Sequence, residues 1–247
     1  MKENKYDNPE FFEQYRRMQR STEGLQGAGE WHQLKKMLPD FKGKRVLDLG
    51  CGFGWHCIYA AEQGAKYVLG TDISEKMLDV ARKQTKSPVV EYKLMPMEDI
   101  NFVENSFDIV ISSLAFHYIE SFDEICAKIN RCLTKDGDFI FSCEHPIFTA
   151  EGSQQWYLDE KLGKPFWPVD SYFYEGQRKA NFLGEEVIKY HRTLTTYMNA
   201  LLNNGFIITG FSEPEPDPEM LKMHPEFKDE LKRPMFLIIS AKKNKRN

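Results

Sequence analysis

Three glycines at alternate positions, Gly50, Gly52 and Gly54, follow an apolar run at residues 46–49 and precede a helical stretch at residues 55–63. Glycine adopts left-handed backbone conformations without steric cost and leaves no side chain in the way of a ligand. A strand, a glycine loop and a helix in this order form the ligand-binding edge of doubly wound α/β sheets. The loop therefore predicts a ligand held closely against the ends of parallel strands.

The loop belongs to a longer alternation of apolar runs and amphipathic helices. The expected strands lie at residues 46–49, 67–71, 89–93, 107–113 and 139–143, and the expected helices at residues 55–63, 74–84 and 121–133. Strands that are apolar throughout are buried on both faces, and helices between them indicate parallel pairing. The predicted fold class is α/β, a doubly wound sheet with helices on both sides.

The segments that flank this alternation are expected to have separate roles. Asn8 and Pro9 predict a helix start in the N-terminal segment. Residues 146–191 are rich in aromatic side chains, with possible strands at residues 171–174 and 186–191. We expect residues 1–40 to form a helical cap, residues 41–145 the cofactor-binding half of the domain, residues 146–191 a substrate-lid insertion, and residues 192–247 the C-terminal half of the same domain.

Charge and composition narrow the class of partner. The chain has 33 Lys plus Arg against 37 Asp plus Glu, a formal net charge of −4, so we expect no nucleic-acid partner. No apolar run is long enough to cross a membrane, and we expect no membrane association. The five cysteines are an odd, scattered set, which is typical of reduced thiols in the cytoplasm. We assign no metal site, and the sequence leaves the oligomeric state open.

An acidic residue at the end of the second expected strand limits the class of ligand that this edge can bind. Asp72 lies 18 residues after Gly54, where a carboxylate accepts hydrogen bonds from both hydroxyls of a ribose. The fingerprint of NAD enzymes has its third glycine one residue later, where this chain has Trp55. The spacing therefore favours a nucleoside-containing ligand other than NAD and argues against an NAD oxidoreductase.

In these motifs the sequence resembles the class I S-adenosylmethionine-dependent methyltransferases, in the small-molecule branch with the signature D-L-G-C-G-x-G. The matching segments are residues 46–54, residues 70–78, which begin G-T-D-I-S, and residues 105–110, which read N-S-F-D-I-V. The resemblance implies a Rossmann-like sheet of seven strands, mostly parallel with the last strand antiparallel. It also implies S-adenosyl-L-methionine as the cofactor, laid across the strand ends.

The resemblance implies a role for each residue that matches the motifs. The glycines of the loop would border the methionine and ribose parts, with Asp48 supporting the loop and the amino group. Asp72 would bind the ribose hydroxyls, and Ile73 and Met77 would lie against the adenine.

Two further contacts are expected from the resemblance. The family usually has Asp or Asn where this chain has Pro96, so the Met97 backbone and Glu98 are expected to contact the adenine amino group instead. Tyr15 resembles part of an N-terminal lid over the sulfonium. The complete set of expected cofactor-binding residues is Tyr15, Asp48, Gly50, Cys51, Gly52, Gly54, Asp72, Ile73, Met77, Met97, Glu98, Ser113 and Leu114.

Two histidines are the candidates for catalysis. Methyl transfer from a sulfonium needs an aligned nucleophile and, where the acceptor must lose a proton, a general base. His117 follows the fourth expected strand and His145 follows the fifth, both at the ligand-binding edge. A packing or capping role is the alternative for each histidine.

The predicted function is transfer of a methyl group from S-adenosylmethionine to a small-molecule acceptor, giving S-adenosylhomocysteine. The alternative is a catalytically idle subunit that binds S-adenosylmethionine and regulates a partner methyltransferase. The aromatic insertion and the histidine-bearing loops favour the enzyme.

Overall fold

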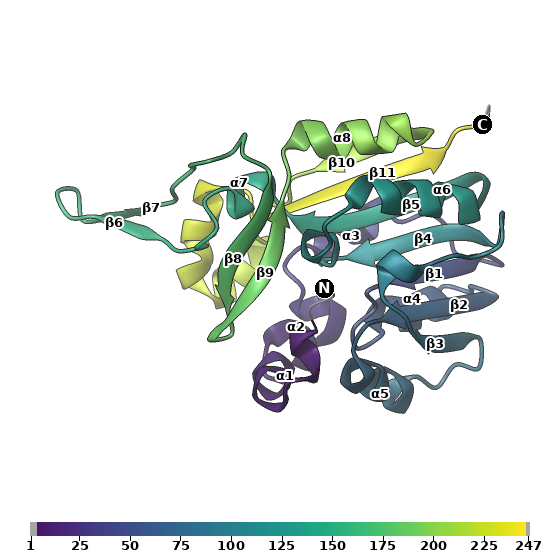
Figure 1. Ribbon diagram of the computed structural model, residues 1–247. Helices are drawn as coiled ribbons and strands as arrows, with labels where there is room; N and C mark the ends of the chain where they lie inside the picture. Colours follow the sequence, from purple (N-terminus) through teal and green to yellow (C-terminus); the bar gives the residue numbers. More distant parts are fainter. Residues whose placement is uncertain (1–3, 246–247) are drawn as a thin grey trace.

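A seven-stranded sheet in the order β10-β11-β5-β4-β1-β2-β3 forms the centre of the computed structural model, which describes residues 4–245 (Figure 1). Neighbouring strands from β3 to β5 run parallel, and β11 is antiparallel to both of its neighbours. The strands are β1 (Arg45–Leu49), β2 (Tyr67–Asp72), β3 (Val90–Leu94), β4 (Phe107–Ser113), β5 (Leu133–Glu144), β10 (Phe206–Ser212) and β11 (Phe236–Lys243). The predicted doubly wound, mostly parallel seven-stranded sheet is confirmed.

Helices cover both faces of the sheet because its central strands are apolar on both sides. On one face, α3, α4 and α5 enclose a core that contains Val46 and Ile111. On the other face, α6 and α8 enclose a second core around Phe139 and Phe141. These helices are α3 (Trp31–Met37), α4 (Trp55–Glu62), α5 (Glu75–Gln84), α6 (Phe122–Cys132) and α8 (Leu194–Asn203). Among residues 4–245 there is no helix with the length and apolar character of a membrane span.

The N-terminal segment lies against the carboxyl edge of the sheet. It contains η1 (Lys5–Asp7), α1 (Pro9–Arg16), α2 (Gln19–Thr22) and η2 (Gly24–Gly27). Asn8 caps α1 as predicted, because its side chain accepts from the Glu10 and Phe11 amides. Asp7 accepts from Ser74 Oγ at 2.6 Å, and Asn4 donates to the Ile73 carbonyl at 3.1 Å. These contacts fasten the segment to the loop after β2.

The insertion after β5 forms a short helix and two separate hairpins (Figure 1). They are α7 (Pro146–Thr149), the hairpin of β6 (Tyr157–Asp159) and β7 (Lys164–Phe166), and the hairpin of β8 (Gly176–Phe182) and β9 (Glu185–His191). The prediction of a strand at residues 186–191 is confirmed. The predicted strand at residues 171–174 is wrong. Ser171 has a φ of +58°, and Tyr174 N donates to the Ser171 carbonyl, so the backbone forms a turn here.

The two hairpins differ in their place relative to the sheet. In Figure 1, β6 and β7 extend away from the body, whereas β8 and β9 stand beside the carboxyl ends of β4 and β5. The remaining short elements are η3 (Met97–Asp99), η4 (Phe116–Tyr118), α9 (Pro218–Met223) and η5 (Pro225–Lys232). The β8–β9 hairpin is therefore the part of the insertion that can border a site at the strand ends.

Candidate active site

A large cavity lies at the carboxyl edge of the sheet, between the glycine loop, the N-terminal segment and the β8–β9 hairpin. Its volume is about 1350 Å³. One small ligand typically occupies a pocket of roughly 300–1,000 Å³. The cavity therefore has room for two small molecules side by side.

The glycine loop forms part of the cavity wall through Gly50 and Gly52. Their φ angles are +71° and +53°, in the left-handed region that favours glycine. A Cβ added to Gly50 would lie 2.7 Å from Ala115 Cβ, so the fold itself requires glycine there. A Cβ added to Gly52 would come no closer to a neighbour than 3.4 Å, from Met77 Cε. The space beside Gly52 is thus the cavity itself.

Asp72 ends β2 and lines the same cavity. Its Oδ2 accepts from Gly52 N at 2.8 Å and its Oδ1 from Ser74 N at 2.9 Å. Each carboxylate oxygen retains a further lone pair, so the pair can still accept two hydroxyl donors. Burial raises the pKa of Asp72 to about 6, although the backbone N–H groups of Ser74 and Gly52 oppose the rise.

The raised pKa of Asp72 leads to a pH prediction. An ionised carboxylate accepts two hydroxyl hydrogen bonds, and protonation removes part of that capacity. We expect the affinity for S-adenosylhomocysteine to fall as the pH drops below about 6, by up to about tenfold per pH unit. Calorimetry across this range, with Asp72→Asn as the control, measures the effect. The variant should bind weakly at every pH; parallel pH curves for the two proteins would contradict the role of Asp72.

Two residues predicted as ligand contacts lie behind the glycine loop and do not line the cavity. Asp48 is buried and accepts from Cys57 Sγ at 3.2 Å, and burial raises its pKa to about 7. A Cβ at Gly54 would overlap Tyr92 Oη, so packing explains this glycine. Cys51 lines only a smaller pocket of about 50 Å³ that adjoins the loop. Asp48 and Gly54 therefore shape the loop from behind, which corrects their predicted contact with the ligand.

The residues predicted for the adenine lie together in the cavity wall. Ile73 and Met77 follow β2, and Met97 and Glu98 come from η3. Lys128 Nζ donates to the Glu98 carbonyl and holds η3 in place. Two further residues complete this wall, Met95 and Pro96. The wall is mostly apolar, which suits a flat ring.

Ser113, Leu114 and Tyr15, which are expected contacts of the cofactor, also line the cavity. Leu114 has a φ of +51°, and its amide donates to the Ser142 carbonyl at 2.9 Å. The Tyr15 ring packs edge-on against Phe53, with 5.7 Å between centroids. The end of β4 and the N-terminal segment therefore both contribute to the cavity wall.

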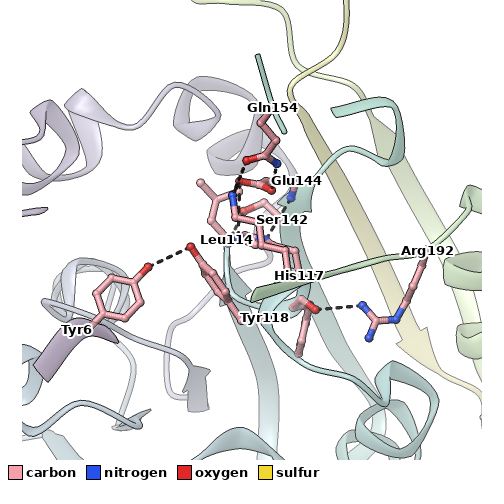
Figure 2. A network of polar contacts seen from close by, with 10 residues as sticks. Tyr6, Leu114, His117, Tyr118, Ser142, Glu144, Gln154 and Arg192 are labelled. Carbon is pink, nitrogen blue, oxygen red and sulfur yellow. Dashed lines mark hydrogen bonds and ion pairs between the residues drawn. The ribbon is translucent and has the colours of Figure 1, made fainter. Parts of the chain in front are cut away.

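His117 lies in the cavity wall within a network of polar contacts that Figure 2 shows. Its Nδ1 accepts from Glu144 N at 3.4 Å, so the ring proton lies on Nε2, 3.9 Å from Glu144 Oε1. Burial lowers the pKa of His117 to about 4, so the ring is neutral near pH 7. Arg192 donates to the Phe116 carbonyl at 3.3 Å and fixes η4, which carries the histidine.

A largely buried ion pair between β5 and β9 completes this network. Lys189 Nζ lies 2.5 Å from Glu144 Oε1 and 2.8 Å from Gln154 Oε1, and Gln154 Nε2 donates to Glu144 Oε2 at 2.7 Å. Burial alone would raise the pKa of Glu144, but the charge of Lys189 and hydrogen bonds from Lys189 and Gln154 hold the pKa below its usual value. Sequence reasoning missed this pair. Its signal was Lys189 on the buried face of β9, between Val187 and His191.

His145 does not line the cavity, which corrects its prediction as a catalytic residue. Its Nδ1 accepts from Ile147 N at 3.0 Å and caps α7. Its Nε2 lies 2.8 Å from Glu213 Oε1. Both ring nitrogens are therefore engaged away from the cavity, and the alternative capping role applies.

The aromatic residues of the insertion contribute less to the cavity than the sequence predicts. Phe148 and Phe182 line it. Trp167 instead stacks on Phe148, with 4.9 Å between centroids, and on the Arg233 guanidinium at 4.1 Å. Phe173 is 87% exposed. Most of these rings hold the insertion together or face solvent.

Residues 47–141 match the family model described as "Methyltransferase domain". A relative from Haemophilus influenzae, described as an uncharacterized protein, is 37% identical over 245 residues, which cover 96% of each chain.

Two solved structures resemble the whole fold. A candidate S-adenosylmethionine-dependent methyltransferase from Listeria monocytogenes is 60% identical, with a TM-score of 0.84, over 90% of this chain and 99% of that one. The S-adenosylmethionine-dependent methyltransferase from Mesorhizobium loti is 43% identical, with a TM-score of 0.84, over 89% and 100%.

More distant relatives carry names with different acceptors. The N-demethylindolmycin N-methyltransferase of Streptomyces griseus is 27% identical and covers 74% of this chain and 77% of its own. The tRNA U34 carboxymethyltransferase of Hahella chejuensis is 28% identical and covers 56% and 47%. These relatives resemble this chain in the methyltransferase domain, but their names specify different substrates.

Proposed function

The chain belongs to the S-adenosylmethionine-dependent methyltransferases, and from that premise we propose that its acceptor is a small molecule. The supporting observation is that two covers meet over the cavity. Phe11 of α1 packs against Ala180 and Val187 of the β8–β9 hairpin. Lys5 Nζ lies 3.7 Å from Glu185 Oε2 at the turn of that hairpin. An acceptor bound beneath these covers must be small.

The residues at the glycine-loop end fit the cofactor. Asp72 has acceptor capacity for two ribose hydroxyls, and the space beside Gly52 is open. Ile73, Met77 and Met97 offer an apolar wall for the adenine. S-adenosyl-L-methionine supplies an electrophilic methyl group on a sulfonium. The chain's part is to hold that group in line with the acceptor and to exclude water.

We propose that the acceptor lies at the other end of the cavity, between η4 and the β8–β9 hairpin. Glu144 and Lys189 line this end, together with the aromatic rings of Tyr118 and Phe182. This assigns the wall of the acceptor site to the inserted residues 146–191, the role that the sequence suggests for them.

The geometry favours Glu144 over His117 as the group that receives a proton. His117 carries its proton on Nε2 and uses Nδ1 on the backbone, so it can donate to the acceptor but not take its proton. Glu144 is ionised, chiefly because the charge of Lys189 holds its pKa low against the effect of burial. An acceptor nitrogen or oxygen becomes acidic as it is methylated, so even a weakly basic carboxylate can receive its proton.

A screen of small metabolites with isotopically labelled S-adenosylmethionine tests the function. We expect at least one labelled product, identified by mass, together with S-adenosylhomocysteine. A protein that binds the cofactor but labels no metabolite, and becomes active only with added RNA or protein, would contradict the small-molecule acceptor. The idle-subunit alternative predicts cofactor binding with no labelled product from any of these classes.

We also propose a cytoplasmic location. Cys51, Cys57, Cys126, Cys132 and Cys143 are all buried free thiols. Unpaired, buried cysteines in every layer of the fold are typical of proteins from a reducing compartment.

A further inference from the structure

Three hydrogen-bond donors lie together at the acceptor end of the cavity. They are His117 Nε2, Tyr118 Oη and Lys189 Nζ, and all three residues line the cavity. The His117 and Tyr118 rings are 4.3 Å apart, and Lys189 Nζ lies 5.9 Å from the centre of the Tyr118 ring (Figure 2). His117 Nε2 and Lys189 Nζ lie near the same oxygen, Glu144 Oε1, at 3.9 Å and 2.5 Å. The three donors therefore belong to one small region of the wall.

His117 and Tyr118 each keep a proton that a ligand can accept. His117 uses Nδ1 on the Glu144 amide, so its ring proton lies on Nε2. Tyr6 Oη donates to Tyr118 Oη at 3.2 Å, which leaves the Tyr118 hydroxyl proton to be donated in turn. Burial and the nearby charge of Glu144 raise the pKa of Tyr118, so this hydroxyl remains protonated.

Lys189 adds a positive charge to these donors. Its Nζ donates to Glu144 Oε1 at 2.5 Å and to Gln154 Oε1 at 2.8 Å. An ammonium has three N–H donors, so within residues 4–245 one donor remains for a ligand. The Glu144 carboxylate balances the charge of the lysine, and its oxygens still have lone pairs with which to receive a proton.

A wall of donors selects the kind of atom that can be methylated beside it. An amine nitrogen has one lone pair, and a hydrogen bond from His117, Tyr118 or Lys189 would occupy the pair that must attack the methyl group. A hydroxyl oxygen has two lone pairs, so it can accept one such bond and attack with the other pair. A protonated amine would also be repelled by the Lys189 ammonium. The wall therefore favours an oxygen acceptor.

Two further observations narrow the oxygen acceptor to a phenol. The centres of the Tyr118 and Phe182 rings lie 5.9 Å and 5.4 Å from Lys189 Nζ, so an oxygen bound there would place its own ring against aromatic side chains. The pKa of Glu144 is below its usual value, which makes this carboxylate a weak base. A weak base suits a phenol, with a pKa of about 10, better than a far less acidic aliphatic alcohol. A carboxylate acceptor would add a second anion beside Glu144.

We propose that the methyl acceptor is a small phenol whose oxygen binds to His117, Tyr118 and Lys189, an assignment that rests on the proposed small-molecule function. The phenol O–H proton passes to the Glu144 carboxylate. The oxygen forms a bond to the methyl carbon, and the sulfur–methyl bond breaks with its electron pair on sulfur. The products are an aryl methyl ether and S-adenosylhomocysteine. Lys189 pairs with the developing phenolate charge in place of the neutralised Glu144.

The test compares three compounds that share a para-methyl ring and differ in one group: p-cresol, p-toluidine and p-toluate. Calorimetry on the protein with S-adenosylhomocysteine bound measures their dissociation constants, and labelled S-adenosylmethionine reports methyl transfer. We expect p-cresol to bind at least about tenfold more tightly than the other two compounds and to yield a labelled methyl ether. Tighter binding of p-toluidine or p-toluate, equal binding of the three compounds or binding of none would overturn the assignment. A labelled product from p-toluidine or p-toluate, or none from p-cresol, would also overturn it.

Tyr118→Phe removes one donor and keeps the ring. The variant should bind p-cresol about 5- to 10-fold more weakly than the wild type does. Its affinity for p-toluidine should change by less than about twofold. Tyr157→Phe is the matched control, because Tyr157 lies on β6 outside the cavity wall, and it should behave as the wild type with each compound. An equal loss of affinity for p-cresol and p-toluidine in Tyr118→Phe would contradict the hydrogen bond to the phenol oxygen.

The metabolite screen separates this assignment from the function on which it rests. An aryl methyl ether as the labelled product supports the phenol. A labelled product with its methyl group on nitrogen, carbon or a carboxylate oxygen would overturn the phenol and leave the small-molecule methyltransferase intact. A screen that labels no small molecule would contradict the proposed function itself.

Discussion

A Gly52→Val variant is expected to fold and to lose cofactor binding, with an affinity for S-adenosylmethionine lower by about a hundredfold or more. An added Cβ meets only Met77 Cε, at 3.4 Å, so the protein can accommodate the new side chain. The branched side chain instead enters the cavity beside Asp72, where the cofactor is expected. The φ of +53° adds a local strain of about 1–3 kcal/mol. Calorimetry and a thermal melt measure the two effects separately.

Gly43→Val is the matched control for this experiment. Gly43 has a φ of +71°, and a Cβ there meets no atom within 4 Å. It lies before β1 and outside the cavity wall. We expect Gly43→Val to lose comparable stability and to keep its affinity for the cofactor. Normal binding by Gly52→Val, or equal loss of binding by both variants, would show that the ligand does not lie against Gly52.

The central sheet could be predicted because its signals are local. Residues such as Val46, Val110 and Ile140 belong to short apolar runs between amphipathic helices, and each run becomes a strand that is buried on both faces. The cofactor end could be predicted for a similar reason. The glycine loop and Asp72 follow neighbouring parallel strands, so topology alone brings them to one edge.

The polar contacts of the acceptor end could not be predicted, because their partners are distant in sequence. Lys189 and Glu144 are 45 residues apart, and Tyr6 meets Tyr118 across 112 residues. Their pairing depends on how the hairpin folds back over the sheet, which no local pattern specifies. The predicted strand at residues 171–174 failed for a related reason, since its aromatic residues suggest a strand while the backbone turns at Ser171.

Two residues lie at the predicted edge of the sheet, but packing or capping explains them better than contact with a ligand. His145 precedes Pro146, the first residue of α7, and a histidine in that place caps a helix as readily as it serves catalysis. Gly54 matches the glycine motif, yet Tyr92 on β3 explains why no side chain fits there. In both cases a packing partner from another element decides the role.

The Glu144–Lys189 pair predicts a large effect on stability. Lys189→Met leaves the Glu144 carboxylate buried without its cation, and breaking a buried pair from one side costs about 3–5 kcal/mol. The double variant Glu144→Gln/Lys189→Met removes both charges and is expected to recover most of that loss. Chemical denaturation measures the free energy of unfolding for each protein. Turnover of the acceptor found by the metabolite screen should fall in all three variants, including Glu144→Gln.

The cofactor end provides the internal standard for this experiment. Lys189 does not contact the glycine loop or Asp72, so affinity for S-adenosylmethionine should change by less than about threefold in the folded variants. Loss of cofactor binding together with turnover would show that the two ends of the cavity are not separate sites.

Lys179→Met is the matched control, because this lysine lies on the same hairpin and pairs with Glu186 at 2.9 Å on the surface. An exposed pair contributes about 0–1 kcal/mol, so the variant should stay near wild-type stability. The pH provides a further check, since without Lys189 the pKa of Glu144 rises toward the value that burial alone would give. Protonation then removes the unpaired charge, and the cost of Lys189→Met should be smaller at about pH 5 than at about pH 7.5. If the double variant is as unstable as Lys189→Met at both pH values, lost packing of the lysine stem and not the unpaired carboxylate is the cause.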